Sequence, residues 1–205
     1  GHNDTITLLH SLGGSVTQAN NDGATPVLDA AETGHKSTVE LLESLGADTS
    51  GISDEVRLVG AAATDDFEEI RRLKNLGTNL DAVTATKYAE DMPAAGTSAL
   101  WVACWFGQAQ AVDALAELGA NTKKGDEGGR SPLYAAASRG KIDAMQVLME
   151  KDKVGVDDSV RSNGATMMWA AAFNGHNDTI TLLHSLGGSV TQAMNKGATP
   201  LWIAA

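Results

Sequence analysis

Apolar residues in this chain fall into short blocks with helical spacing, and polar segments that contain glycine separate the blocks. The clearest example is residues 161–193, where Thr166 can cap a helix that begins MMWAAAF and ends at Asn174–Gly175. A second helix follows and stops at Gly187–Gly188. Its apolar residues share one face: Ile180, Leu182, Leu183 and Leu186. The pattern predicts two short antiparallel helices and a polar loop, which cannot enclose a core without copies on either side.

The chain contains those copies. Residues 1–19 recur letter for letter at 175–193, and the Gly-Ala-Thr-Pro of residues 23–26 returns at 197–200. The first glycine of this motif recurs at a spacing of about 33 residues in the second half of the chain. It stands at Gly23, Gly96, Gly129, Gly164 and Gly197. The wide interval between the first two of these glycines predicts a degenerate repeat between them.

The order G-x-T-P-L, A-A-x-x-G-H and L-L-x-x-G-A within each period resembles the ankyrin repeat, and the resemblance covers nearly the whole chain. It implies an all-α solenoid of stacked helix-turn-helix units with hairpin-like loops. We expect residues 1–205 to form about five full repeats with half-repeats at both ends, because the chain opens in a second helix and closes in a first helix. We therefore expect the natural ends to lie outside these residues.

The pattern weakens over residues 51–84, which lack both the motif glycine and Thr-Pro. Such a segment resembles the starting repeat of an ankyrin array. We therefore consider a division of the chain into the tail of one array, residues 1–50, and a second array, residues 51–205. Either Asp65 or Asp66 is expected to cap the second helix of the weakened repeat.

Two features of the same segment predict a weak joint in the stack. Gly60 lies inside the expected first helix, where glycine is unfavourable. The exit loop, residues 82–95, is about nine residues longer than the usual loop, and lengthened loops in repeat proteins are often functional. Each feature removes regular contacts between neighbouring repeats, so we expect residues 51–95 to open before the regular part of the array.

Composition says little about the fold, but together with the sequence motifs it narrows the kinds of site that we expect in this chain. The 205 residues are 42% hydrophobic and only 4% aromatic, which suits helices that approach closely through alanine and glycine. The single Cys104 cannot form an internal disulfide, which fits either a reducing compartment or indifference to redox state, and we expect an intracellular location, cytoplasmic or organellar. No phosphate-binding loop, paired-cysteine motif or HExxH motif occurs, so we expect no catalytic residue, no metal and no cofactor. No apolar run approaches the ~20 residues of a membrane span.

Charge argues against nucleic acid as the partner. The formal net charge is −11 at pH 7, and most of it comes from residues 1–95. A chain of this sign would confront phosphates with like charge. Lysines and arginines do gather over residues 123–161, but acidic residues share that region. We therefore interpret the region as a mixed solvated surface in preference to an anion-binding patch.

Most of the aromatic residues lie in the expected first helices of the last four repeats, and they form two sets. One set occupies the slot of the histidine in the family's Thr-Pro-Leu-His motif, where an aromatic ladder would tie repeats together: Trp101, Tyr134, Trp169 and Trp202. The other set stands just before the turn glycine, where residues of this family line the concave groove: Trp105, Phe106 and Phe173. Large apolar groups left on a groove favour recognition. The alternative is that a long loop, such as residues 82–95, covers these rings and makes them core.

Equivalent positions of successive repeats become neighbours along the groove of a solenoid. The register therefore places Arg139 between the rings of the flanking repeats, in one row with Phe106 and Asn174. The groove candidates for partner binding are Trp105, Phe106, Arg139, Phe173 and Asn174. By resemblance to the family, the loop tips contribute Asn21, Asp22, Glu127, Arg130, Ser162, Asn163 and Lys196.

The resemblance implies a non-catalytic scaffold that binds another protein through its concave groove and loop tips. Two other roles stay open. The chain can be the regulatory or targeting segment of a larger multidomain enzyme, or a permanently assembled accessory subunit of a large complex. Ankyrin arrays serve unrelated processes, so the fold by itself does not choose among these roles.

Overall fold

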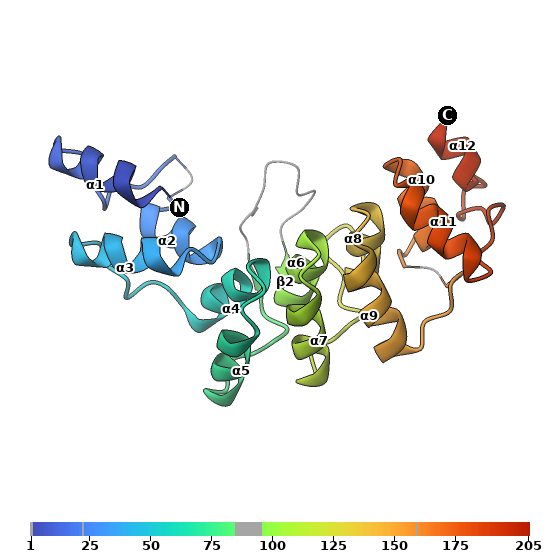
Figure 1. Cartoon of the computed structure of the whole chain (residues 1–205), viewed down its shortest axis with the longest axis horizontal. Helices are drawn as coiled ribbons and strands as arrows, with labels where there is room; N and C mark the ends of the chain where they lie inside the picture. The colour runs from blue at the N-terminus through green and yellow to red at the C-terminus, as the bar shows by residue number, and fades with distance from the viewer. Residues whose placement is uncertain (1, 22, 85–95, 159) are drawn as a thin grey trace.

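The computed structural model describes residues 2–21, 23–84, 96–158 and 160–205, and the regular secondary structure of these residues is almost entirely helical. The helices are α1 (Asn3–Ser11), α2 (Pro26–Glu32), α3 (Lys36–Ser44), α4 (Asp54–Ala63), α5 (Phe67–Asn75), α6 (Ala99–Phe106), α7 (Ala109–Glu117), α8 (Pro132–Ser138), α9 (Ile142–Asp152), α10 (Met167–Phe173), α11 (Asn177–Ser185) and α12 (Pro200–Ala204). They follow one another in chain order along an arched array (Figure 1). The expected all-α solenoid is confirmed.

Helix pairs are the unit of this array. Within the described residues the pairs are α2 with α3, α4 with α5, α6 with α7, α8 with α9, and α10 with α11. The first helices of the pairs contact one another from α2 to α12 and form an inner row, while α5, α7 and α9 contact one another in the outer row (Figure 1). α1 and α12 are the half-repeats at the two ends, as the sequence predicts.

Short polar side chains start the inner helices. The hydroxyls of Thr25, Ser98, Ser131, Thr166 and Thr199 each accept a hydrogen bond from the backbone N–H three residues later, at 3.1–3.4 Å. Each bond satisfies a donor that the helix leaves unpaired, and such a cap is worth about 1 kcal/mol. The cap that the sequence predicts at Thr166 is therefore confirmed, and the other inner helices start in the same way. Ser53 caps α4 in the same way.

Left-handed residues turn the chain between the helices of a pair. Gly107 takes this conformation after α6, with φ of 83°. Asp65 holds the equivalent place after α4, with φ of 61°. The degenerate repeat therefore keeps the family's turn geometry with an aspartate in place of glycine. Asp66 follows as the cap of α5, and its carboxylate accepts the Glu69 N–H at 3.0 Å.

The loops between repeats form short antiparallel ladders. β1 (Val83–Thr84) pairs with β2 (Thr97–Ser98), with Val83 opposite Ser98 and Thr84 opposite Thr97. A further bridge joins Arg130 to Arg161 in the next two loops. The lengthened loop thus begins and ends in backbone pairing, while residues 85–95 of it lie outside the described residues.

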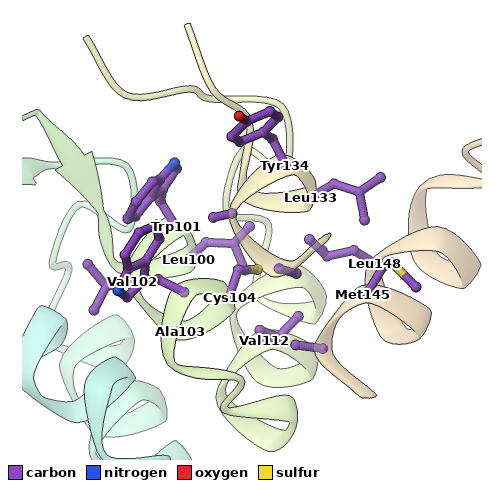
Figure 2. Close-up of a cluster of buried hydrophobic side chains, with 14 of the residues drawn as sticks. Leu100, Trp101, Val102, Ala103, Cys104, Val112, Leu133, Tyr134, Met145 and Leu148 are labelled. Carbon is purple, nitrogen blue, oxygen red and sulfur yellow. The ribbon is translucent and has the colours of Figure 1, made fainter. Parts of the chain in front are cut away.

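Neighbour-to-neighbour burial forms the core. Every residue of α8 is buried, and its three alanines let α6 and α10 approach closely. Figure 2 shows the packing around α6, where Leu100 and Cys104 meet Leu133 of α8 and Met145 of α9. Burial raises the pKa of the Cys104 thiol far above its usual range, so this cysteine is inert.

The hydrophobic core has two parts along the chain. The larger cluster of buried residues runs from Leu58 to Leu183, and the smaller one from Val16 to Ile52. A solenoid allows such a division, because each unit buries surface only against its neighbours. The smaller cluster ends at Ile52 and the larger one starts at Leu58. The division between them therefore lies close to the boundary at Gly51 that the sequence suggests between two arrays.

Close backbone contact joins the two parts. A Cβ atom at Gly60 of α4 would overlap the carbonyl oxygen of Ala31 in α2, and one at Gly34 would overlap the carbonyl oxygen of Gly60. The sequence predicts that Gly60 weakens this joint, because glycine is unfavourable inside a helix. That reason does not hold here, because no larger residue fits at this position. Glycine is needed there because two backbones touch.

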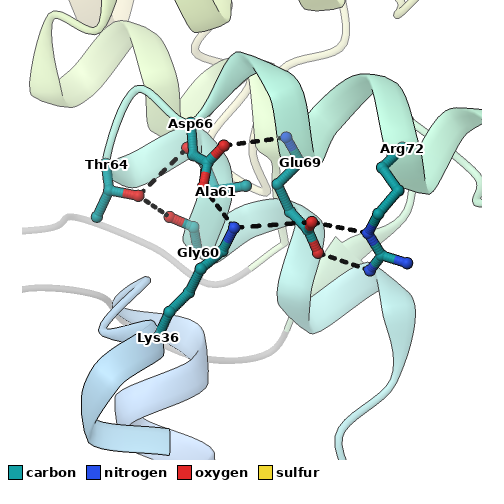
Figure 3. Close-up of polar contacts among 7 residues, drawn as sticks. All are labelled: Lys36, Gly60, Ala61, Thr64, Asp66, Glu69 and Arg72. Carbon is teal, nitrogen blue, oxygen red and sulfur yellow. Dashed lines mark hydrogen bonds and ion pairs between the residues drawn. The ribbon is translucent and has the colours of Figure 1, made fainter. Parts of the chain in front are cut away.

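An ionic cluster lies over the same contact (Figure 3). Lys36, the first residue of α3, places its ammonium 2.5 Å from Asp66 and 3.7 Å from Glu69. Arg72 donates to Glu69 from the other side, at 2.7 and 2.8 Å. The hydrogen bonds from Arg72, against a smaller effect of burial, hold the pKa of Glu69 below its usual range, and the charge of Lys36 adds to this. The cluster therefore links the units on both sides of Gly51.

Candidate functional site

The candidate groove residues come from the C-terminal ends of three consecutive inner helices. Phe106 ends α6, Ser138 ends α8 and Phe173 ends α10, each just before the turn. Arg139 and Asn174 occupy the C-cap positions that follow α8 and α10. The structure therefore places Arg139 and Asn174 at equivalent positions of stacked units, and Ser138 and Phe173 likewise, in the register that the sequence predicts.

Trp105 and Arg139 form a contact between two repeats. The guanidinium carbon of Arg139 lies 4.6 Å from the centre of the Trp105 ring, within the range of a cation–π interaction. The other neighbour of that ring is Trp101, one helical turn earlier on α6, at 5.2 Å and an interplanar angle of 16°. The indole of Trp105 is therefore layered with an arginine of the next repeat and a tryptophan of its own helix.

The expectation that Trp105 is an exposed ring of the groove is wrong. Trp105 is only 6% exposed. The physical reason is the i, i+4 spacing on α6, which brings Trp105 onto Trp101, together with Arg139 arriving from α8. Phe106 is half-buried and packs against the core cluster. In this part of the groove the exposed group is therefore Arg139.

Among the groove candidates, Phe173 is the large ring that the structure leaves exposed. It is 54% exposed, although its ring stacks on Trp169 at 5.5 Å and an interplanar angle of 7°. The adjacent Asn174 is exposed, and its amide donates to the carbonyl of Ala170 at 3.1 Å. α10 therefore presents a supported apolar ring beside a polar side chain held by its own helix.

The aromatic ladder links repeats at two of its four positions. The indole N–H of Trp101 donates to the carbonyl of Arg130 in the next loop, at 3.0 Å. Tyr134 lies under the guanidinium of Arg161, which also belongs to the next loop, at 5.6 Å. Trp169 is buried, but its indole N–H has no partner within the part of the chain that the structure describes. Trp202, in the last helix, is 69% exposed.

The Arg130 side chain binds within its own loop. Its guanidinium donates to the carboxylate of Asp126 at 2.7 Å, and that carboxylate also accepts the backbone N–H groups of Gly128 and Arg130. The Asp126 side chain is fully buried and that of Arg130 is 14% exposed. Arg130 is thus mainly a residue that holds the loop together. Sequence reasoning missed Asp126, although an aspartate four residues before an arginine in a glycine-rich loop is a signal for this turn.

The other loop-tip candidates lie on the surface. Glu127, Ser162, Lys196 and Asn21 are exposed. Asn163 is half-buried: its side chain accepts the N–H of Ala165, and its carbonyl accepts the N–H of Asn195 in the next loop. Asp22 lies outside the described residues. Beside these tips, a cavity of about 660 Å³ opens between the consecutive loops that carry Gly129 and Ser162.

Several polar side chains in the described part of the chain form hydrogen bonds within or between repeats. No group of three or more histidine, cysteine or acidic side chains is placed to hold a metal ion among these residues. None of the described helices is both long and apolar enough to span a bilayer. His176, at the start of α11, donates from its ring to the carbonyl of Ser138 in the preceding repeat, at 2.9 Å. This histidine is therefore a tie between repeats.

Comparisons with known proteins agree with this architecture. A family model described as ankyrin repeats in three copies matches residues 58–158. The chain is 34% identical over 105 residues to "Ankyrin repeat and KH domain-containing protein mask" of Drosophila melanogaster. It is 27% identical over 153 residues to "Ankyrin repeat and KH domain-containing protein mask-1" of Caenorhabditis elegans, and 33% identical over 103 residues to "Ankyrin repeat and KH domain-containing protein 1" of Homo sapiens.

These relatives are far longer than the matched region. The matches cover 51%, 75% and 50% of this chain, respectively, but only 3%, 6% and 4% of the relatives. The similarity therefore concerns the repeat array and not the whole of those proteins.

Proposed function

The chain belongs to the ankyrin-repeat family, and we propose that it is a non-catalytic scaffold that binds another protein through its concave groove and loop tips. Repeats of this family are generally protein-interaction modules. The proposal assigns the binding surface to the ends of α8 and α10, where Arg139 and Phe173 are exposed, with Asn174 beside them.

The observation that carries this proposal is the support beneath the two exposed groups. Phe173 rests on Trp169, and Arg139 rests on Trp105, which in turn rests on Trp101. An aromatic ring or arginine held in place before binding loses little conformational freedom when a partner arrives. Supported aromatic and arginine side chains are the groups that dominate interface energies. Folding alone gives no reason to leave Phe173 more than half exposed.

Loop tips extend this surface. Glu127, Ser162 and Lys196 are exposed on consecutive loops, on the same repeats as the groove residues. Charged groups at the rim of an interface affect partner choice and association rate more than affinity. The acidic chain, with a net charge of −11, makes a protein a better partner than a nucleic acid. A protein partner in an intracellular compartment completes the proposal.

A pair of surface variants tests the proposal. Phe173→Ala and Arg139→Ala each remove one exposed group, so capture of partners from the native source should fall by about tenfold or more. Leu76→Ala is the matched control, because Leu76 is 62% exposed on the outer row and away from the groove. Equal capture by all three variants, measured by affinity purification and mass spectrometry, would contradict binding through the groove.

The length of the relatives favours a second role. Because the matches cover only 3–6% of those proteins, the array can serve as the regulatory or targeting segment of a larger multidomain enzyme, or as an accessory subunit of a large complex. An antibody against residues 129–193 can detect the native polypeptide and show its mass. A mass far above that of the array would indicate a segment of a larger multidomain protein. Co-migration of this polypeptide with one large complex at all times would instead indicate the accessory subunit.

A further inference from the structure

Aspartate side chains join consecutive loops at two interfaces of the array. Asp81, in the loop after α5, accepts the backbone N–H of Asn121 in the next loop at 2.8 Å. Asp157, in the loop after α9, accepts the N–H of Ser189 in the next loop at 2.7 Å. Each aspartate lies four residues after the left-handed residue that follows its outer helix. At these two interfaces a carboxylate therefore lies between the loops.

The interface between these two is formed by the loops after α7 and α9, and it carries the opposite charge at the same position. Lys123 lies four residues after the left-handed Gly119, where the other two loops have aspartate. The equivalent backbone N–H, that of Gly155, donates instead to Asp158 in its own loop at 2.7 Å. The carboxylate that joins the loops on either side is therefore replaced here by a lysine.

A cavity of about 660 Å³ opens at the same interface. Its apolar lining comes from Leu133, Val154 and Val160. Lys123 lines it from the loop after α7, and Arg161 lines it from the loop after α9. The cavity therefore lies where the aspartate is missing, between two consecutive loops in the interior of the array.

The two lysine and arginine side chains of the lining are available to a ligand. Neither Lys123 nor Arg161 forms an ion pair with a residue that the structure describes. Lys123 is exposed, and Arg161 is half-buried. The guanidinium of Arg161 lies over the Tyr134 ring at 5.6 Å, so it is held in place before a ligand arrives.

Three carboxylates also line the cavity, and two of them are already bonded. Asp126 is buried and accepts from the Arg130 guanidinium and from two backbone N–H groups. Asp158 accepts the N–H of Gly155. The third is Asp152, the last residue of α9. Together with Arg130 the lining is formally neutral, whereas the whole chain has a net charge of −11, so an anion meets less repulsion here.

We infer that this cavity takes a carboxylate side chain from an acidic segment of the protein partner. The inference rests on the proposed function and names the chemistry that the loop side of the binding surface recognises. The partner's carboxylate would lie where Asp81 and Asp157 place theirs at the flanking interfaces, with Lys123 and Arg161 as the cations that bind it. Hydrogen bonds between ionised groups of this kind are stronger than those between neutral groups. The apolar lining accommodates the aliphatic part of the same side chain.

Binding of a fluorescently labelled hexaglutamate peptide to the 205-residue chain tests the inference. Fluorescence polarisation at low ionic strength should show saturable binding that weakens as salt is added. A hexaglutamine peptide should not bind, because it is uncharged. Absence of saturable hexaglutamate binding would overturn the inference. So would displacement of hexaglutamate by inorganic phosphate or a short oligothymidylate at lower concentrations than by unlabelled hexaglutamate, because the site would then prefer phosphates.

Substitutions in the lining locate the site. Lys123→Met and Arg161→Met each remove one cation and keep an apolar side chain, so each should weaken hexaglutamate binding at least about tenfold. Lys74→Met is the matched control, because Lys74 is exposed on α5, which does not line the cavity. It changes the net charge equally and should bind as the wild type does. Equal losses in the three variants would overturn the inference.

The exposed position of Lys123 keeps the test valid if Arg161→Met fails to fold. Circular dichroism should show Lys123→Met folded, because this side chain is exposed. Undiminished hexaglutamate binding by a folded Lys123→Met chain would by itself overturn the inference.

Capture of partners from the native source separates this inference from the proposed function. Capture that falls with Phe173→Ala and Arg139→Ala but not with Lys123→Met would support the proposed function and overturn the inference. Hexaglutamate binding that depends on Lys123, with capture unchanged by all three variants, would contradict the proposed function and leave the cavity as a carboxylate site. Loss of both capture and hexaglutamate binding in Lys123→Met supports the inference.

Discussion

The carboxylate of Asp65 accepts a hydrogen bond from the backbone N–H of Ala111 at 2.7 Å, and so joins the turn of one repeat to the first turn of α7 in the next. Gln108, the N-cap residue of α7, makes no capping bond with its side chain. Its amide instead donates back to the carbonyl of Ala63, at 2.7 Å. Asp65 thus caps a helix to which it does not belong, within the repeat whose sequence pattern is the weakest.

Removal of this cap should weaken the stack. Asp65→Ala leaves a helix donor unpaired and places an ordinary side chain at a left-handed φ of 61°, so the free energy of unfolding should fall by about 1–2 kcal/mol. Asp65→Asn keeps an acceptor oxygen and tolerates the left-handed region, so its loss should be smaller. Urea denaturation of both variants measures the difference. Equal stability of the alanine and asparagine variants would show that the bond to Ala111 contributes nothing.

The substitution Gly60→Ala tests whether alanine stabilises or destabilises the protein at this position of α4. Alanine usually stabilises the middle of a helix relative to glycine by about 0.5–1 kcal/mol. In α4 the added Cβ would overlap the carbonyl of Ala31, so we expect Gly60→Ala to lower the melting temperature and to separate α2 from α4. Gly51→Ala is the control, because nothing lies within 4 Å of the atom added there. A more stable Gly60→Ala protein would mean that the two backbones do not touch.

The two buried tryptophans of the ladder should respond differently to the same substitution. Trp101→Phe removes the bond to the Arg130 carbonyl, which then keeps only the N–H of Asp126, so we expect a cost of about 0.5–1.5 kcal/mol beyond the lost volume. Trp169→Phe removes an indole N–H that has no partner among the described residues. It therefore breaks no hydrogen bond, and its cost comes from the lost side-chain volume. Thermal unfolding of the pair should show Trp101→Phe to be clearly the less stable. The reverse order would contradict the described bonding.

Hydrogen exchange should locate the weak end of the array. The sequence pattern places it at residues 51–95, but Ile70 and Leu73 of α5 are completely buried within the larger cluster. α1 has no buried residue, and α2 and α3 belong to the smaller cluster. We therefore expect amides of α1–α3 to exchange before those of α8–α11, with α4 and α5 closer to the latter. Faster exchange in α5 than in α3 would restore the sequence-based expectation.

The candidate site was only partly predictable from the sequence. Register along the solenoid correctly placed Arg139 and Asn174 at equivalent positions, because the repeat period sets which residues are neighbours. Burial of Trp105 was not predictable, since it depends on Trp101 beneath it and on Arg139 arriving from the next repeat. The bond from Asp65 to Ala111 crosses 46 residues of sequence and depends on the same stacking.

The duplicated segment shows what the local sequence determines and what only the tertiary structure decides. Residues 1–19 and 175–193 are identical, and both copies form a helix with the same bounds, Asn3–Ser11 and Asn177–Ser185, that ends in the same way at Leu12 and Leu186. Helix, turn and apolar face are therefore properties of the local sequence, because capping, glycine turns and side-chain spacing act within a few residues. Burial differs completely between the copies, as Leu9 and Leu183 show. Burial depends on which helix lies alongside, and only the stacking of the whole chain decides that.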